Sequence, residues 1–200
     1  MAKIRFTKGE LKKQRDALKQ YRRYLPTLQL KKQQLQMEIL HQTLLAASKK
    51  AEDAVRITAA EEWAGLLSDE NIDLRSWVMP VKTLATTRNV AGVELPVFGS
   101  CLFYQAEYDL FTIPQWIDRA IDNLRELFSG REEISVIEEG IERLKRELRV
   151  TTQRVNLFEK VKIPEAEEII RRIKIYIGDQ MANAVGRSKA AKRKIEAAFI

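Results

Sequence analysis

Apolar residues recur at alternating spacings of three and four along the first part of the chain, roughly Lys8 to Asn71. An α-helix turns once in about 3.6 residues, so this spacing places the apolar side chains on one stripe. Such a stripe is typical of a coiled-coil seam and predicts one long helix that packs against another. The series has one polar position, Lys32, and its apolar members are Leu11, Leu18, Tyr21, Leu25, Leu28, Leu35 and Ile39.

Beyond Ile39 the apolar stripe is expected to continue with less regular spacing. Its expected members are Leu40, Leu44, Leu45, Val55, Ile57 and Leu67. The run Ser68-Asp69-Glu70-Asn71 is the first plausible end of the helix, because such short polar side chains favour turns.

A second long helix is predicted from roughly Ile117 to Ala198. Its seam consists of Ile134, Ile137, Ile141, Leu144, Leu148, Thr151, Val155 and Phe158. After Pro164 the spacing contains one extra residue, which predicts a stutter that relaxes the supercoil. The later seam members are Ile170, Ile173, Ile177, Met181, Ala184, Ser188, Ala191, Ile195 and Ala198. The small residues Ala184, Ser188 and Ala191 predict that the two helices approach closely there and form a narrow end.

Residues 80–115 have a different pattern, rich in Thr and Val. Two short apolar and β-branched segments, Lys82 to Val90 and Val93 to Phe98, flank Ala91-Gly92. This arrangement predicts a short β-hairpin. Pro96 restricts the second strand to a sheet edge, because proline has no N–H to donate.

These elements predict a mainly α protein, a long antiparallel two-helix coiled coil with a short central β-hairpin insert. The expected division is residues 1–78 for the first helix, 79–116 for the insert and 117–200 for the second helix. Folding the chain about residue 95 places Pro26 opposite Pro164, so both helices are expected to be disturbed at the same height. About 65 paired residues at ~1.5 Å each would make a rod of roughly 100 Å.

Composition supports long helices, since 200 residues contain only 8 Gly and 5 Pro. The net charge of +7 is unevenly distributed. Residues 1–50 carry 13 basic and 3 acidic residues (+10), and residues 151–200 carry 11 and 6 (+5). The intervening residues carry 11 and 19 (−8), so both chain ends are basic and the middle is acidic. In an antiparallel hairpin the two basic ends would share one end of the rod.

Several kinds of chemistry are not indicated by the sequence. The single cysteine, Cys101, cannot form an internal disulfide, and the single histidine, His41, argues against Cys/His zinc sites and His-based catalysis. The sequence contains no apolar run of the ~20 residues that span a bilayer. Gly178 and Gly186 do not have the spacing of a phosphate-binding loop. No catalytic, cofactor-binding or metal-binding residue is therefore assigned.

Two groups of residues could instead bind partners. A basic cluster near the C-terminus consists of Arg187, Lys189, Lys192, Arg193 and Lys194. Trp77 and Trp116 flank the insert, where they could pack it or serve as exposed anchors for a partner. The basic ends leave a nucleic-acid-binding helical hairpin as an alternative function, although no aromatic residues interleave with the cluster.

The run Thr151-Thr152-Gln153-Arg154-Val155-Asn156-Leu157-Phe158-Glu159-Lys160-Val161, followed by Lys162-Ile163-Pro164-Glu165-Ala166-Glu167-Glu168, resembles the D subunit of the V-type ATPases. The segment from Leu25-Pro26-Thr27-Leu28 to Leu35 is similar to bacterial members of that family. The likeness covers about residues 8–70 and 117–195, and the insert matches only loosely.

The resemblance implies a rotor shaft without catalytic sites, whose paired terminal helices enter a hexamer of alternating catalytic and non-catalytic subunits. It also implies a second stalk protein, the F subunit, beside the shaft and a funnel-shaped subunit that links it to the membrane ring. Torque would pass between ATP hydrolysis or synthesis and proton or sodium transport, at the cytoplasmic side of a membrane. Leu11, Leu18, Trp77, Trp116 and the basic cluster are the expected partner contacts.

Overall fold

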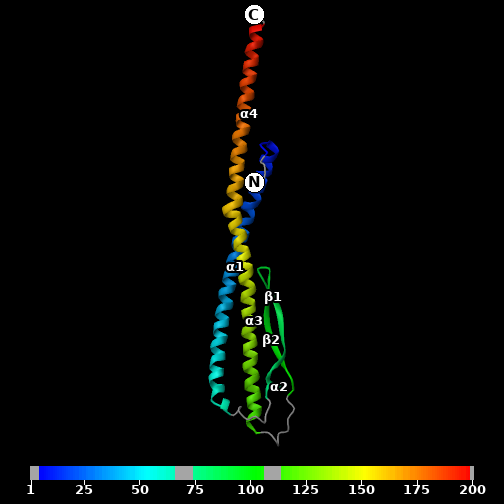
Figure 1. Cartoon of the computed structure of the whole chain (residues 1–200), viewed down its shortest axis with the longest axis vertical. Coiled ribbons are helices and arrows are strands. Elements are labelled where there is room, and N and C mark those ends of the chain that lie inside the picture. The colour runs from blue at the N-terminus through cyan, green and yellow to red at the C-terminus, as the bar shows by residue number, and fades with distance from the viewer. Residues whose placement is uncertain (1–4, 66–73, 106–113, 199–200) are drawn as a thin grey trace. The chain divides into compact units, whose positions relative to one another are not determined.

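A computed structural model describes residues 5–65, 74–105 and 114–198 of the chain. Two long helical segments come before and after a small two-stranded sheet in the chain, and the sheet lies to one side of α3 (Figure 1). This confirms the predicted mainly α fold with a β-hairpin insert. The elements in chain order are α1 (Lys8–Glu61), α2 (Arg75–Val78), β1 (Pro80–Val90), β2 (Val93–Phe103), α3 (Trp116–Leu157), the π-helical turn η2 (Phe158–Lys162) and α4 (Ile163–Ala198).

The chain divides into two compact units, each containing parts of both long helical segments. The first unit comprises residues 1–31 and 151–200, and the second comprises residues 32–150. The α-helix α1 ends at Glu61, earlier than expected, and the predicted stop at residues 68–71 lies outside the described residues.

In the second unit, α1 and α3 run antiparallel. Leu35 shares a buried cluster with Leu144, and Ala46, further along α1, packs with the earlier α3 residues Ile137 and Ile141. The residue numbers of the contacting positions therefore fall along α3 as they rise along α1, as expected for antiparallel helices. Lys49 Nζ, 3.3 Å from a carboxylate oxygen of Glu133, continues the same antiparallel order.

The seam of α1 beyond Ile39 differs from the prediction. Leu40, Leu44 and Val55 are exposed, and the inward positions are Gln42, Ala46, Lys49, Asp53 and Ile57. These residues continue the earlier spacing of three and four. Of the expected apolar members, Ile57 lies on this inward face, whereas Leu40, Leu44, Leu45 and Val55 are exposed, and Leu67 lies outside the described residues. Lys49 and Asp53 are tolerated in this seam because α3 offers them charged partners, whereas Gln42 donates a hydrogen bond to Glu38 on its own helix. Arg131 Nε, for example, lies 3.9 Å from Asp53 Oδ2.

The β-hairpin is confirmed, with a second strand longer than predicted. β1 and β2 pair antiparallel, and the two-residue loop Ala91-Gly92 has positive φ at both positions (51° and 80°). Such loops match the twist of the paired strands. Leu95 on β2 joins the buried cluster of Leu35 and Leu144, so the hairpin packs against both helices. Arg88 strengthens this contact, with its guanidinium 2.6 Å from Glu38 Oε1.

In the first unit, the extra residue in the seam spacing is accommodated by the π-helical turn η2, just before Pro164, and not by the expected coiled-coil stutter. The Ile163 N–H bonds to the Phe158 carbonyl, five residues back. A π turn accommodates one more residue than an α turn, so the buried side of the helix stays in phase from Val155 to Ala166, Ile170 and Ile173. By contrast, α1 continues through Pro26 without a break, so only one helical segment carries the expected irregularity.

The helices of the first unit pack antiparallel through aromatic and charged pairs. Tyr21 and Phe158 have ring centroids 5.4 Å apart, and Phe6 lies 5.1 Å from Tyr176. Arg22 bonds Glu167 at 2.6 Å. Since α1 begins at Lys8, close to the contact between Phe6 and Tyr176, the later residues of α4 have no other helix of the described residues beside them.

Candidate partner-binding surfaces

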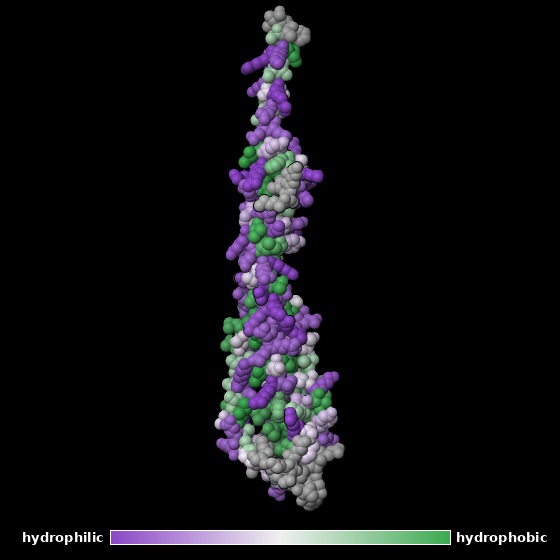
Figure 2. Space-filling model, viewed as in Figure 1, coloured by the Kyte–Doolittle hydropathy of each residue, from purple (hydrophilic) through white to green (hydrophobic). Residues whose placement is uncertain are grey.

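The end of α4 is exposed on every side, from Gly178 to Ala197. Ala184, Ser188 and Ala191, expected to lie between closely packed helices, contact no second helix among the described residues. Met181, Val185 and Ile195 are more than half exposed. Figure 2 shows this part of α4 as mostly hydrophilic with scattered apolar residues.

The predicted basic cluster lies on this exposed end of α4. Arg187, Lys189, Lys192, Arg193 and Lys194 are all exposed. Lys192 Nζ lies 3.7 Å from Glu196 one turn away, with both side chains largely in solvent. Such pairs contribute only about 0–1 kcal/mol, so the cations remain available to a partner.

Leu11 lies in an open groove of the first unit, where α1 begins. Its apolar walls are Leu11, Ile177 and Met181, and its rim carries charged residues. The groove has a volume of about 550 Å³ and its charged residues are Lys8, Lys12, Arg15 and Asp16. Leu18 lies two turns further along α1 and is half-buried in the seam. The structure therefore places these two predicted contacts in the same unit as the basic cluster.

Trp77 and Trp116 lie together in the second unit, far along the chain from the basic cluster. Both pack against the buried residues Val78, Ile117 and Ile121. The Trp77 carbonyl accepts a hydrogen bond of 3.0 Å from Arg125 Nε, which ties the segment before the hairpin to α3. This packing accounts for both tryptophans as supports of the insert, and a contact with a partner stays a prediction.

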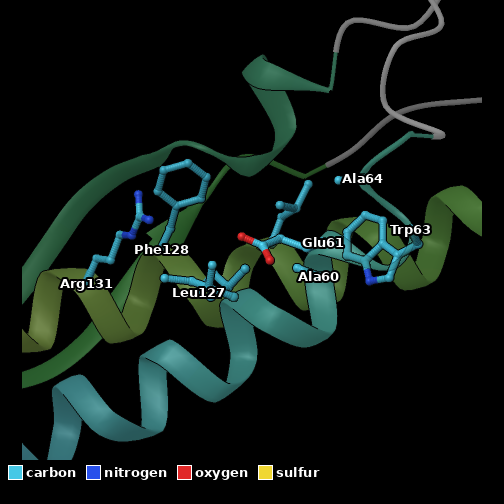
Figure 3. A pocket seen from close by; sticks show the side chains of 9 residues that line it. Ala60, Glu61, Trp63, Ala64, Leu127, Phe128 and Arg131 are labelled. Carbon is cyan, nitrogen blue, oxygen red and sulfur yellow. The ribbon is translucent and has the colours of Figure 1, made fainter.

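An apolar hollow of about 190 Å³ lies between the end of α1, with the residues just after it, and residues 124–131 of α3 (Figure 3). Trp63 and Ala60 border it from the α1 side, and Leu127 and Phe128 border it from α3. Glu61 and Arg131 are the charged residues of its lining. The hollow is too small for a helix and can receive one apolar side chain.

Charged groups on α4 interact strongly with one another. Glu168 accepts hydrogen bonds from Arg171 at 2.8 and 2.9 Å and from Arg172 at 2.8 Å. These two arginines, Arg171 first, lower the pKa of Glu168 to about 2. In the second unit, the hydrogen bond and charge of Glu133 raise the pKa of Lys49. The first effect stabilises the surface of α4, and the second links α1 to α3.

Sequence reasoning missed one surface, the exposed apolar face of α1 that includes Met37, Leu40 and Leu44. The available signal was that extending the 3-4 series strictly from Ile39 leads to Gln42 and Ala46, which leaves the leucines on a different face. Among the described residues, no group of three or more His, Cys, Asp or Glu side chains could hold a metal ion. In the same residues, no helix is long and apolar enough to cross a membrane.

Together, the paired helices, the hairpin packed on them and the exposed basic helix end define a coiled-coil protein whose exposed surfaces suit protein partners. The chain belongs to the family of ATP synthase D subunits, whose sequence pattern matches residues 10–193.

Relatives match the chain almost end to end. A V-type ATP synthase D subunit from Borreliella burgdorferi is 42% identical over 195 residues, covering 98% of this chain and 96% of the relative. Proteins of the same name from Chlamydia pneumoniae and Chlamydia trachomatis serovar L2 are each 32% identical. They cover 96% and 98% of this chain, and 93% and 97% of their own lengths. The chain is therefore a V-type ATP synthase subunit, as its resemblance to that family indicated.

Proposed function

We propose that the chain is the central stalk of a V-type ATPase or ATP synthase and transmits torque between its catalytic hexamer and its membrane ring. The observation that carries this proposal is the exposed end of α4. Residues 184–197 are helical and exposed on all sides, yet they continue the apolar spacing of the seam. A helix with such a stripe gains stability when surrounding subunits cover it, which suits a shaft tip held in a bearing.

The packing within each unit suits a shaft that resists bending. In the second unit, Leu35, Leu95 and Leu144 form a buried cluster across three elements. Bending such a packed seam must displace many close contacts at once, because protein interiors are dense. As the shaft turns, it presents a different helix face to each catalytic site. Each face can bias one site toward an open or a closed state.

The proposed partners are the catalytic and non-catalytic subunits of the hexamer, the F subunit of the stalk and the funnel-shaped subunit above the membrane ring. The basic cluster of α4, with Leu11 and Leu18, would contact the hexamer. In this role the chain has no catalytic site of its own, and it works at the cytoplasmic side of the membrane through the complex. The family assignment favours this function over the nucleic-acid alternative.

A rotation assay tests the torque role directly. Cys101→Ser removes the single natural cysteine, and Ser100→Cys, on the exposed part of β2, then provides one site for a gold or bead probe. With the hexamer fixed to a surface, ATP should turn the probe in one direction, whereas a probe on the hexamer should stay still. A probe on the introduced cysteine that stays fixed while the complex hydrolyses ATP would contradict the proposal.

A further inference from the structure

Three ion pairs join α1 to α3 within a short stretch of the second unit. They pair Lys49 with Glu133 at 3.3 Å, Lys50 with Glu138 at 2.6 Å and Asp53 with Arg131 at 3.9 Å. Each pair crosses from one helix to the other. All three therefore depend on how the two helices are aligned along their length.

Asp53 depends most on this alignment, because it is the most deeply buried of these charges. The residue is only 8% exposed, and its Oδ1 has no hydrogen-bond donor among the described residues. A buried charge needs an opposite charge close by, since loss of that partner leaves it desolvated and unpaired. Lys49 is partly buried as well, with a side chain 30% exposed, and the hydrogen bond and charge of Glu133 raise its pKa.

The apolar contacts between the same helices fit more than one alignment. Ala46 packs with Ile137 and Ile141. A shift by one heptad, ~10 Å along the axis, would bring Leu144 and Leu148 opposite Ala46, or in the other direction Ile134 and Gly130. Both shifted alignments keep uncharged contacts at this position. Apolar burial alone therefore separates the three registers only weakly.

The charges separate the registers more strongly. If each residue of α1 met a partner one heptad earlier on α3, Lys50 would face Arg131, which carries a like charge. Asp53 would face the apolar side chain of Leu124, and only the remaining lysine would find a carboxylate, at Glu126. This shift would leave the buried carboxylate unpaired, which is strongly unfavourable.

A shift in the opposite direction is unfavourable for a second reason. With partners one heptad later on α3, Lys50 would face Lys145 and Asp53 would face Glu138, so both would meet a like charge. The remaining lysine would face Gly140. Of the three registers, only the observed one gives every one of these charges an opposite partner.

We propose that the three ion pairs fix the register of α1 along α3 and exclude the two neighbouring heptad registers. Charged and polar residues in a coiled-coil seam specify register at a cost in stability. This inference goes beyond the stalk function and does not depend on it, because it concerns the pairing of two helices within the chain. In a shaft, a fixed register would also keep the helices from sliding past each other under load.

The distance between two spin labels reports the register directly. In the full chain with Cys101→Ser, labels are attached to Ser48→Cys on α1 and Asn123→Cys on α3, both exposed positions. The second label lies well before the α3 residues that face the first. A shift toward earlier α3 residues therefore brings the labels together, and the opposite shift separates them, by about 10 Å along the axis. Double electron–electron resonance measures this distance.

Reversing the α1 charges should change the register in a defined direction. Lys49→Glu, Lys50→Glu and Asp53→Lys place three like-charge pairs in the observed register. One heptad later on α3, Glu at position 50 would face Lys145 and Lys at position 53 would face Glu138. We expect the labels to move apart by about 10 Å along the axis. Retention of the original distance would overturn the proposal.

Reversing the α3 charges in the same chain provides the rescue. Arg131→Glu, Glu133→Lys and Glu138→Lys restore all three pairs with opposite sign, so the original distance should return. The hairpin residues that contact both helices, Arg88 and Leu95, are unchanged in every variant. A register fixed by the hairpin alone would therefore show the original distance throughout. A changed distance that the α3 reversals fail to correct would also overturn the proposal.

An uncharged variant gives a second measurement with little effect on side-chain size. Lys49→Gln, Lys50→Gln and Asp53→Asn should produce a second distance beside the original one, because no α1 charge then selects the register. The matched control is Lys12→Gln, Lys13→Gln and Asp16→Asn, which has the same residue types and spacing at exposed positions of the first unit. It should keep a single distance. Circular dichroism verifies that both variants keep their helices, and a single original distance in both would overturn the proposal.

Discussion

At the scale of single residues, Glu168 illustrates how neighbouring arginines set the charge of an exposed side chain. Its carboxylate accepts hydrogen bonds from Arg171 and Arg172, which lower its pKa from 4.5 to about 2. A carboxyl whose folded pKa lies below its unfolded value stabilises the fold above the unfolded pKa. That contribution is fully present above about pH 4.5 and is lost as the pH falls through about 2.

A titration of Glu168 followed by carbon NMR tests this effect. In the unmodified chain, the carboxyl signal should shift near pH 2. Arg171→Gln removes the largest cause and should move the midpoint upward toward 4.5. Lys174→Gln, a charge removal on the same helix, should leave the midpoint in place. A midpoint that does not move in Arg171→Gln would show that these hydrogen bonds do not form in solution.

At two other residues, the surrounding packing decides the backbone conformation or the size of the side chain. Ala91 has a φ of 51°, a conformation that costs an ordinary residue roughly 1–2 kcal/mol. Its methyl group packs against the buried cluster of Leu35, Leu95 and Leu144, and that contact offsets the cost of the turn. At Gly130 on α3, the lack of a side chain has a different reason. A side-chain carbon there would come within 3.2 Å of Arg56 and 3.5 Å of Asp53, which occupy the space.

At the scale of elements, the π-helical turn η2 explains how α4 keeps its seam facing α1. Thr151, Val155, Phe158 and Lys162 follow the alternation of four and three, but the next buried residue is Ala166, one residue later than that alternation predicts. The π turn takes up this residue next to Pro164, which has no N–H for an α-helical bond. A deletion inside η2 should therefore restore a regular α-helix without rotating the buried residues that follow.

Two single-residue deletions test this explanation. Deleting Lys160, which is exposed within η2, should change the melting temperature by only a few degrees. Deleting Glu139, which is exposed on α3, rotates Ile141 and Leu144 out of the core by about 100°. Loss of such residues costs about 2–5 kcal/mol each, so the melting temperature should fall by about 10 °C or more. Similar losses in both variants, measured by circular dichroism, would show that η2 does not absorb the extra residue.

At the scale of the whole molecule, the separation of charge along the chain bears on assembly. The five cations near the end of α4 lie in solvent, with one weak pair between Lys192 and Glu196. A shaft that meets equivalent partners in turn needs contacts that exchange easily. Exposed pairs cost about 0–1 kcal/mol to break, whereas buried pairs cost about 3–5 kcal/mol. Exchangeable contacts therefore suit rotation better than deep, specific ones.

Charge variants of the assembled complex test the proposed bearing, in which the basic cluster of α4 makes exchangeable contacts with the hexamer. Arg187→Ala alone should change the rate of ATP hydrolysis little, because four cations remain. Replacing Arg187, Lys189, Lys192, Arg193 and Lys194 by Glu together should weaken retention of the chain in the complex. Loss of hydrolysis in Arg187→Ala alone, with the complex intact, would contradict this prediction and indicate that Arg187 makes a specific contact.

The sequence alone determined the element types, the antiparallel order and the position of the hairpin. Leu11 to Ile39 and Ile134 to Val155 carry regular 3-4 spacings, and a regular apolar period requires a buried helix face whatever covers it. Ala91-Gly92 between two β-branched runs left few alternatives to a hairpin turn. The basic residues near the C-terminus could be predicted to lie together, because charge clustered in sequence stays clustered on one stretch of helix, and their contact with a partner stays a prediction.

Only the tertiary structure decided which face of α1 is buried beyond Ile39. That stretch has one stripe through Ala46 and another through Leu40 and Leu44. Apolar content alone favours burial of the second stripe, but the structure buries the first. Lys49 and Asp53 face α3 because Glu133 and Arg131 on that helix carry the opposite charges. The sequence alone does not show which polar residues will have partners across a seam. The same holds at the end of α4. Its spacing predicts a covered face, but residues 184–197 are exposed and no other helix of the described residues lies beside them.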